Sequence, residues 1–237
     1  MDLEIIETRR IEALQGPLRH PLLKLGLMLI RPFNRLVRST RFGRVEYYPI
    51  DRLPWAGALE AQTPAIRAEL DTVLSRLKEV PNAQDAFKGQ EALTTDDKWK
   101  TFVFLRGSGV WEESNCRRCP QTHQALQRIP GLEHAMFSIL APGKRQPAHF
   151  GPYAGLIDCH LGLRVPADAE RCRLRVGQTT VSWHEGKLLA FDDSLEHEVW
   201  NDTDSQRAVL LFYVVRPLPW PLSALNNGLM RFLERVL

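Results

Sequence analysis

Residues 186–201 read G-K-L-L-A-F-D-D-S-L-E-H-E-V-W-N, and we interpret the rest of the chain outward from this stretch. An apolar run at 188–191 is bounded by Gly on one side and by Asp-Asp-Ser on the other, which is typical of a buried strand. His197 follows, at the mouth of such a strand, where an imidazole can bind a metal ion or transfer a proton. His149, in P-A-H-F-G-P-Y, is the best candidate for its partner.

Short apolar segments separated by Gly and Pro recur on both sides of this stretch. They predict strands at 98–105, 134–140, 156–165, 172–176, 178–183, 188–191, 198–200 and 207–215. Amphipathic spacing predicts helices at 64–78 and 120–128, whereas residues 82–97 are polar and are expected to be irregular. Many short strands at this spacing indicate a β-sandwich or jelly roll.

A set of short motifs occurs in a fixed order between residues 135 and 217. They are His149-Phe-Gly-Pro, His160-Leu-Gly-Leu, Trp183-His-Glu-Gly-Lys, Phe191-Asp-Asp-Ser, Glu196-His-Glu-Val-Trp and Arg207. In order and spacing they resemble the aspartyl/asparaginyl β-hydroxylase family of iron(II)- and 2-oxoglutarate-dependent dioxygenases. The resemblance implies a mainly β fold with flanking helices, a cupin-like double-stranded β-helix (jelly roll). It also implies an enzyme that uses O₂ and 2-oxoglutarate to hydroxylate an unactivated C–H bond.

The resemblance makes His149 and His197 the iron(II) ligands and the catalytic residues. Two histidines and one carboxylate, with open positions, mark non-haem iron oxygenases. The carboxylate normally comes two residues after the first histidine, but Gly151 occupies that position. The aspartyl/asparaginyl branch shares this absence, with water in place of the acid. Asp192 and Asp193 are the alternative donors, although a turn and hydrogen bonds to the ligating histidines suit them better.

Cosubstrate binding is also assigned by the resemblance. Arg207, ten residues after His197, matches the arginine that binds the distal carboxylate of 2-oxoglutarate, a task for which a guanidinium fork is suited. Ser138 matches a serine that helps to hold the same carboxylate, and His160 matches a histidine near the metal-bound end. Asp158 stands where the family commonly has arginine, which indicates a different substrate.

Other histidines and the cysteines are not expected to take part. His20 and His123 lie in polar surroundings, and His134 and His184 are expected at the surface. Cys116-Arg-Arg-Cys119, with His123 nearby, has zinc-like spacing, but reduced surface thiols are favoured over a small zinc site. The alternative to an enzyme is a catalytically silent β-sandwich that binds a metal or small anion through the same residues.

Charge divides the chain unevenly. It has a net charge of +3, but residues 13–45 contain seven Lys or Arg and no acid, so the remainder is negative. Within this segment Lys24, Arg31, Arg35 and Arg38 share one face of a predicted helix that Pro32 is expected to kink. The segment either lies in an anionic membrane interface or docks on the protein's own core. Its apolar run is too short to span a bilayer.

Four regions are therefore predicted: a basic amphipathic segment at 1–45, a helical and loop scaffold at 46–98, the dioxygenase domain at 99–217 and an amphipathic helix at 218–237. The acidic start is unlike a secretory signal, so a cytoplasmic protein, peripheral on the inner face of the membrane, is expected. No nucleic-acid partner is expected. The substrate is a small molecule, a peptidyl Asp or Asn, or a lipid acyl chain. Gly151-Pro-Tyr-Ala-Gly and Arg216-Pro-Leu-Pro-Trp add a secondary resemblance to bacterial lipid A hydroxylases.

Overall fold

The computed structural model describes the backbone of residues 21–43, 45–87, 90–107 and 109–236, and the side chains of these residues apart from 21–27 and 234–236. The start of the basic segment, with His20, lies outside the described residues. Lys24 is placed only as part of a helix.

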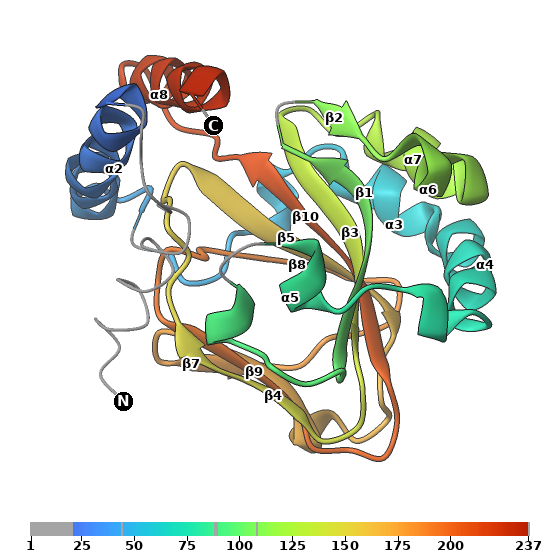
Figure 1. Ribbon diagram of the computed structural model, residues 1–237. Coiled ribbons are helices and arrows are strands. Elements are labelled where there is room, and N and C mark those ends of the chain that lie inside the picture. The colour runs from blue at the N-terminus through green and yellow to red at the C-terminus, as the bar shows by residue number, and fades with distance from the viewer. Residues whose placement is uncertain (1–20, 44, 88–89, 108, 237) are drawn as a thin grey trace.

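The described residues form ten strands in two sheets (Figure 1). The larger sheet has the order β2-β1-β3-β10-β5-β8, and the smaller has the order β4-β9-β6-β7. All neighbouring strands are antiparallel. The strands are β1 (Trp99–Arg106), β2 (Val110–Trp111), β3 (Leu132–Leu140), β4 (Lys144–His149), β5 (Leu156–Arg164), β6 (Cys172–Val176), β7 (Thr179–Val181), β8 (Leu188–Phe191), β9 (His197–Asn201) and β10 (Arg207–Val215). This arrangement confirms the predicted double-stranded β-helix.

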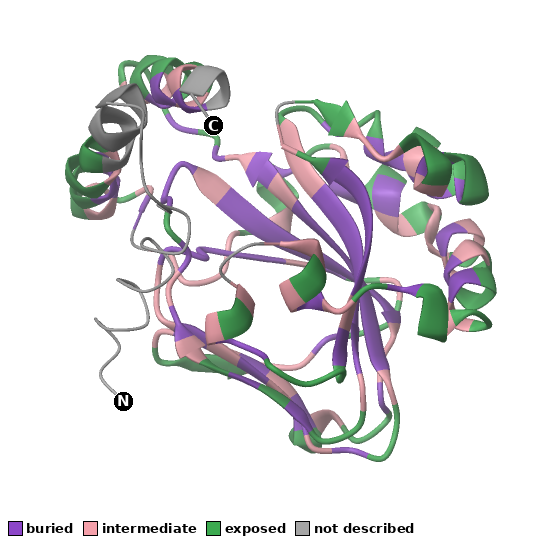
Figure 2. Cartoon of the chain, in the orientation of Figure 1, coloured by how far each residue is buried: buried purple, intermediate pink, exposed green. Residues whose placement is uncertain are grey.

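The burial pattern of each strand explains whether it could be predicted from the sequence. Strands β6 and β9 alternate between buried and half-buried residues, as expected when one face is covered and the other meets solvent. Strands β5 and β10 are buried almost throughout because helices cover the outer face of their sheet (Figure 2). Strand β4, which reads K-R-Q-P-A-H, was not predicted. It has few strand-forming residues and is held by pairing with β9.

Four helices cover the outer face of the larger sheet: α3 (Ala56–Ala61), α4 (Thr63–Leu74), α6 (Glu113–Arg118) and α7 (Pro120–Leu126) (Figure 1). Helix α4 confirms the amphipathic helix predicted at 64–78, and its residues Ile66, Leu70 and Val73 are buried. They share one core with the outer faces of β1, β3, β5 and β10. A second core lies between the two sheets, and it surrounds the site described below. The described residues of the stretch expected to be irregular, 82–87 and 90–97, include α5 (Ala83–Ala86) and a short 3₁₀ turn at Gln90–Ala92.

The expectation of surface thiols at Cys116 and Cys119 was wrong. Their exposed fractions are 4% and 0%, because α6 packs on β1 and places both side chains in the core. Burial raises the pKa of both thiols, that of Cys119 to about 12. Because both side chains lie in this core, we assign the pair to packing.

The two terminal helices, α2 (Pro21–Ser39) and α8 (Leu222–Val236), pack against each other at one side of the barrel (Figure 1). Phe33 and Val37 of α2 meet Leu229 and Leu233 of α8 in a third apolar cluster. Pro32 lies inside α2, which continues past it. The helix therefore docks on the protein's own core through one side, while Met28 and Leu29 remain exposed on the other. No helix within the described residues is both long and apolar enough to cross a membrane.

Candidate active site

A cavity of about 290 Å³ lies inside the barrel, between the two sheets, and collects nearly all the predicted site residues. Those that line it are Ser138, His149, Asp158, His160, Asp193, His197 and Arg207. They come from strands β3, β4, β5, β9 and β10 and from the turn between β8 and β9. Segments far apart in sequence thus meet in one cavity.

His149 and His197 face each other across the smaller sheet. His149 ends β4, His197 begins β9, and the two are direct partners in the antiparallel register. Their ring centroids are 4.1 Å apart, and each residue is 5% exposed. Nδ1 of His149 lies 2.7 Å from the carbonyl oxygen of Pro147, and Nδ1 of His197 lies 2.9 Å from that of Leu195. A carbonyl only accepts, so each Nδ1 carries the hydrogen and each Nε2 keeps a lone pair, as metal ligation requires.

Asp193 fills the space beside this pair. Its Oδ1 lies 3.1 Å from Nε2 of His197. A Cβ placed on Gly151 would lie 1.7 Å from Asp193 Oδ2, so glycine is required there for the close approach of the carboxylate. The carboxylate of Asp193, from another segment, therefore occupies the space that a side chain at position 151 would enter. A carboxylate oxygen facing an imidazole lone pair needs a cation or a proton between them, which fits a cation site.

A three-residue metal cluster is not formed, however. Across the described parts of the chain, no group of three or more His, Cys, Asp or Glu is arranged to hold a metal ion. The geometry therefore fits two protein ligands with Asp193 alongside.

Arg207 is a buried cation without an anionic partner. It is 1% exposed, its guanidinium carbon lies 4.4 Å from the centre of the Trp183 ring, and Nη1 donates only a long 3.5 Å hydrogen bond to the carbonyl of Ser138. Among the described residues no carboxylate forms an ion pair with it, and Nε has no hydrogen-bond partner. Burial lowers the pKa of Arg207 to about 10, which still leaves it charged at neutral pH. Such an arrangement is costly unless a ligand supplies the anion.

Ser138 stands beside this arginine on the cavity wall. Its Oγ accepts a 3.1 Å hydrogen bond from Nε1 of Trp99. The hydroxyl hydrogen is left to donate into the cavity, where an anion held by Arg207 would lie.

His160 and Asp158 occupy neighbouring inward positions of β5. Nε1 of Trp183 donates to Nδ1 of His160 over 3.1 Å, which places the hydrogen of His160 on Nε2. Nε2 lies 3.3 Å from Asp158 Oδ1, although neither atom has a hydrogen-bond partner. Both residues are 3% exposed.

The expectation that Asp192 supports the histidines was wrong. Its Oδ1 accepts from the hydroxyl and backbone N–H of Ser194, and its Oδ2 forms a 2.7 Å ion pair with Arg216. It does not line the cavity. Asp192 and Asp193 point to opposite sides of the chain, so only Asp193 reaches the histidines.

Two features of the site were not predicted. His134 was expected at the surface, but it lines the cavity, and burial lowers its pKa. Trp99 and Trp183 received no role, although their indole N–H groups orient Ser138 and His160. For Trp183, the Trp183-His-Glu-Gly-Lys motif was a signal in the sequence that could have indicated a role. His184 is exposed as expected, and His123 is half-buried against Trp111.

The described chain is thus a double-stranded β-helix with two facing histidines and a buried arginine in its interior. The chain belongs to the aspartyl/asparaginyl β-hydroxylase family, whose model matches residues 60–217. It is therefore a hydroxylase-family oxygenase.

Similar proteins include a lipid acyl hydroxylase and an aspartyl/asparaginyl β-hydroxylase. An ornithine lipid ester-linked acyl 2-hydroxylase from Rhizobium tropici is 46% identical over 82% of this chain and 69% of its own. The human aspartyl/asparaginyl β-hydroxylase is 33% identical over 68% of this chain, which spans 21% of that protein. A Pseudomonas putida prolyl-4-hydroxylase structure overlaps 66% of this chain and 88% of its own, at 17% identity and a TM-score of 0.41, too distant a likeness to support an argument.

Proposed function

We propose that the chain is an iron(II)- and 2-oxoglutarate-dependent hydroxylase. The observation that carries this proposal is the buried, unpaired Arg207, which shares one cavity with the facing imidazoles of His149 and His197. A cation fixed at this depth suits a cosubstrate with a terminal carboxylate. A silent binding module would have no need for both features in one cavity.

In this proposal Nε2 of His149 and Nε2 of His197 would hold the iron, with the carboxylate of Asp193 beside them. Arg207 and Ser138 would bind the distal carboxylate of 2-oxoglutarate, and Nε2–H of His160 would donate to its other end. When bound, the iron and its cosubstrate supply the oxidising chemistry for a C–H bond. The protein positions these groups and excludes water from them.

The proposed substrate is an acyl chain of a membrane lipid rather than a peptidyl Asp or Asn. Support comes from the higher identity and wider coverage of the lipid hydroxylase relative. The composition of the cavity agrees, because much of its wall is apolar, including Phe87, Leu93, Met136, Phe150, Leu156 and Leu211. Such a wall suits a methylene chain.

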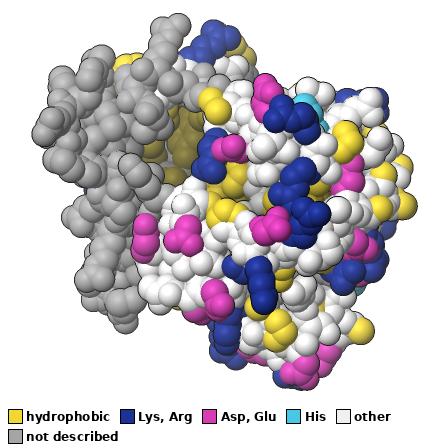
Figure 3. All heavy atoms as spheres, turned by 45° about the vertical axis from the view of Figure 1, so that its right-hand side comes forward, with side chains coloured by type: hydrophobic (Ala, Val, Ile, Leu, Met, Phe, Trp, Pro, Cys, Tyr) yellow, Lys and Arg dark blue, Asp and Glu magenta, His cyan; other side chains and the backbone are white. Residues whose placement is uncertain are grey.

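We place the enzyme at the cytoplasmic side of a membrane, in contact with anionic lipid through residues 13–45 and through α8. The exposed residues described in and next to these helices include Met28, Leu29, Leu36, Trp220 and Leu225, and Arg31 and Arg35 of α2 are exposed as well. Helix α2 contains no acidic residue. By contrast, the face near α4, α6 and α7 mixes basic and acidic side chains (Figure 3). Apolar and basic residues together suit an anionic interface.

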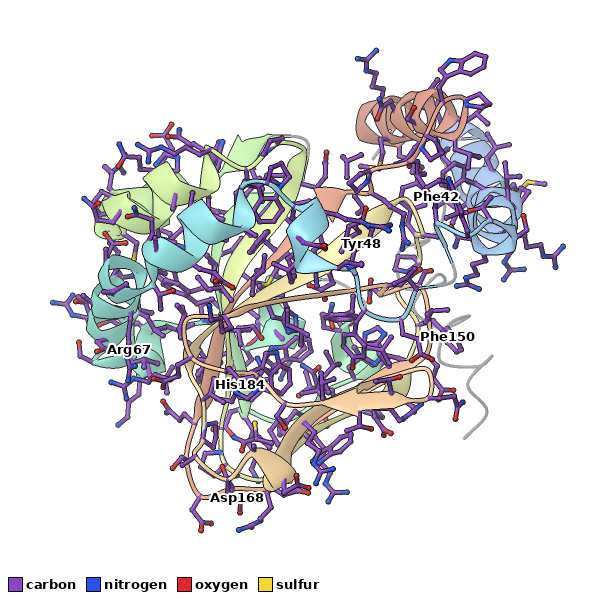
Figure 4. All side chains as sticks on the ribbon, turned by 180° about the vertical axis from the view of Figure 1, so that it is seen from behind. Phe42, Tyr48, Arg67, Phe150, Asp168 and His184 are labelled. Carbon is purple, nitrogen blue, oxygen red and sulfur yellow. The ribbon has the colours of Figure 1, made fainter. Side chains whose placement is uncertain are left out.

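Two buried asparagines join this surface to the cavity wall. Asn34 of α2 donates to the carbonyl of Pro152 and accepts from the N–H of Ala154, both over 2.9 Å. Asn226 of α8 accepts from the hydroxyl of Tyr153 and donates to the carbonyl of Gly155. This loop follows Phe150, below the helix pair in Figure 4. Membrane contact would therefore lie next to a loop that lines the cavity, through Phe150, Pro152 and Tyr153.

Turnover assays test the reaction and the substrate together. Iron(II), ascorbate and 2-oxoglutarate should give succinate in step with hydroxylation of an ornithine lipid, and not of an Asp- or Asn-containing peptide. His149→Ala should abolish both iron binding and turnover. Hydroxylation of the peptide alone would assign the enzyme to the peptidyl branch, and a folded, iron-loaded protein without any turnover would favour the silent module.

A further inference from the structure

Asp158 is a buried carboxylate in the cavity that the proposed reaction leaves without a task. It lies within β5, between its pairing partners Phe191 and Tyr213 on the neighbouring strands. It is 3% exposed, it lines the cavity, and its Oδ1 has no hydrogen-bond partner among the described residues. Because a central strand of the sheet carries it, its position is rigid.

His160 does not donate a hydrogen bond to the carboxylate of Asp158. The 3.3 Å separation between Asp158 Oδ1 and His160 Nε2 lacks the geometry of a hydrogen bond, and both atoms are unsatisfied. Trp183 fixes the other nitrogen of His160, so the imidazole cannot exchange its donor and acceptor. A buried carboxylate oxygen without a donor is unfavourable, because it has lost its water and gained nothing in return. A bound ligand with a hydrogen-bond donor would remove that cost.

The charges around the cavity indicate what kind of donor. Its described lining contains two carboxylates, Asp158 and Asp193, and a single Lys or Arg, Arg207. In the proposed function the two positive charges of iron(II) and the two negative charges of 2-oxoglutarate cancel. The positive charge of Arg207 then offsets one of the two carboxylates in the lining, so one negative charge is left over. We assign it to Asp158, whose Oδ1 has no hydrogen-bond partner, and the substrate would neutralise it.

We propose that Asp158 binds a primary ammonium group on the headgroup of the substrate lipid. This inference rests on the proposed function, since it concerns the substrate of the same cavity. An ammonium group offers both the positive charge and the hydrogen-bond donor that the site lacks. Asp158 would then decide which headgroup is accepted and fix the position of the acyl chain relative to the histidines.

Binding of matched lipids tests the inference. The full-length protein, loaded with iron(II) and 2-oxoglutarate without oxygen, is titrated calorimetrically with a short-chain lipid bearing a headgroup ammonium. The same lipid with that amine acetylated is titrated in parallel. Wild type should bind the ammonium form at least about tenfold more tightly. Asp158→Asn should bind the two lipids equally, whereas Asp51→Asn, which removes an exposed carboxylate outside the cavity, should keep the preference.

The affinity for 2-oxoglutarate separates this role from a structural one. If Asp158 acted only by orienting His160, Asp158→Asn would weaken 2-oxoglutarate binding and leave the lipid preference intact, which would overturn the inference. Equal binding of the two lipids by wild type would overturn it without any variant. Efficient hydroxylation of the acetylated lipid by wild type, with no preference in binding, would uphold the proposed function and reject this inference. Preferential binding of the ammonium lipid without its hydroxylation would uphold this inference and reject the proposed function.

Discussion

The two ends of strand β10 each bury an arginine, and the two are held in opposite ways. Arg216, just beyond the strand, forms an ion pair with Asp192 in which the side chains are 1% and 0% exposed. It also donates to the backbone carbonyls of Phe42 and Leu156. Arg207, at the first position of the strand, has no such counterion and stacks on Trp183.

This difference separates a structural arginine from a ligand-binding one. The charge of Arg216 is neutralised within the chain, and the network fastens the start of β5, the end of β8 and the loop after α2. The charge of Arg207 is neutralised only when an anion enters the cavity. Burial alone would not distinguish the two arginines, whereas the presence or absence of a counterion within the chain does.

The largest effect is expected at the arginine that has a counterion, Arg216. Asp192→Asn leaves Arg216 buried and unpaired, and should lower the free energy of unfolding by about 3–5 kcal/mol in denaturant titrations. Glu113→Gln, which removes half of an exposed helical ion pair with Arg117, is the control and should change stability by less than about 1 kcal/mol. A small loss in Asp192→Asn would mean that Arg216 finds other partners, and the contrast with Arg207 would weaken.

The stabilising partner of Arg207 should be a bound ligand, whereas that of Arg216 is a residue of the chain. In iron-loaded wild type, 2-oxoglutarate at a hundred times its dissociation constant should raise the free energy of unfolding by about 2.7 kcal/mol. At the same concentration, Arg207→Met should gain far less. Thermal unfolding with and without 2-oxoglutarate measures this stabilisation. If wild type and Arg207→Met were stabilised equally, the cosubstrate carboxylate would be held elsewhere.

Affinity measurements isolate the contribution of Arg207 itself. Each lost hydrogen bond to a charged carboxylate is worth about 1.5–3 kcal/mol, so Arg207→Met should weaken 2-oxoglutarate binding about tenfold or more. The apo variant should lose less stability than Asp192→Asn, because it removes a buried charge that has no partner. An apo variant as unstable as Asp192→Asn would assign Arg207 a structural role.

The smallest effect per residue is expected for arginines that are not buried at all. Arg31 and Arg35 are exposed on α2, and each should contribute up to about 1 kcal/mol to binding of an anionic bilayer. Arg31→Glu/Arg35→Glu should therefore reduce flotation with anionic vesicles at low salt and leave stability unchanged. Deletion of residues 1–45 is a poorer test, because it also removes Asn34 and Phe33 from the packed interior. Wild type that does not float would rule out the membrane contact.

The sequence predicted the fold and most of the residues that meet in the cavity. The β3, β5, β6, β8 and β10 strands were expected close to their observed bounds, because their apolar runs and turn residues are local signals. The motif order identified His149, His197, Ser138, His160 and Arg207, all of which line one space. Strand β4 was missed because its pairing with β9, rather than its composition, makes it a strand.

By itself, then, the sequence determined the double-stranded β-helix, the family and the side chains available for chemistry. Only the tertiary structure decided how these side chains are used. Asp192 and Asp193 are adjacent and chemically identical, yet one is neutralised by Arg216 and the other reaches His197 through the space left by Gly151. Likewise Arg207 and Asp158 matter because each is buried with a polar atom, Nε of Arg207 and Oδ1 of Asp158, that has no hydrogen-bond partner among the described residues. Local sequence encodes strand and turn, but the partner of a buried charge is set by which distant segments the fold brings beside it.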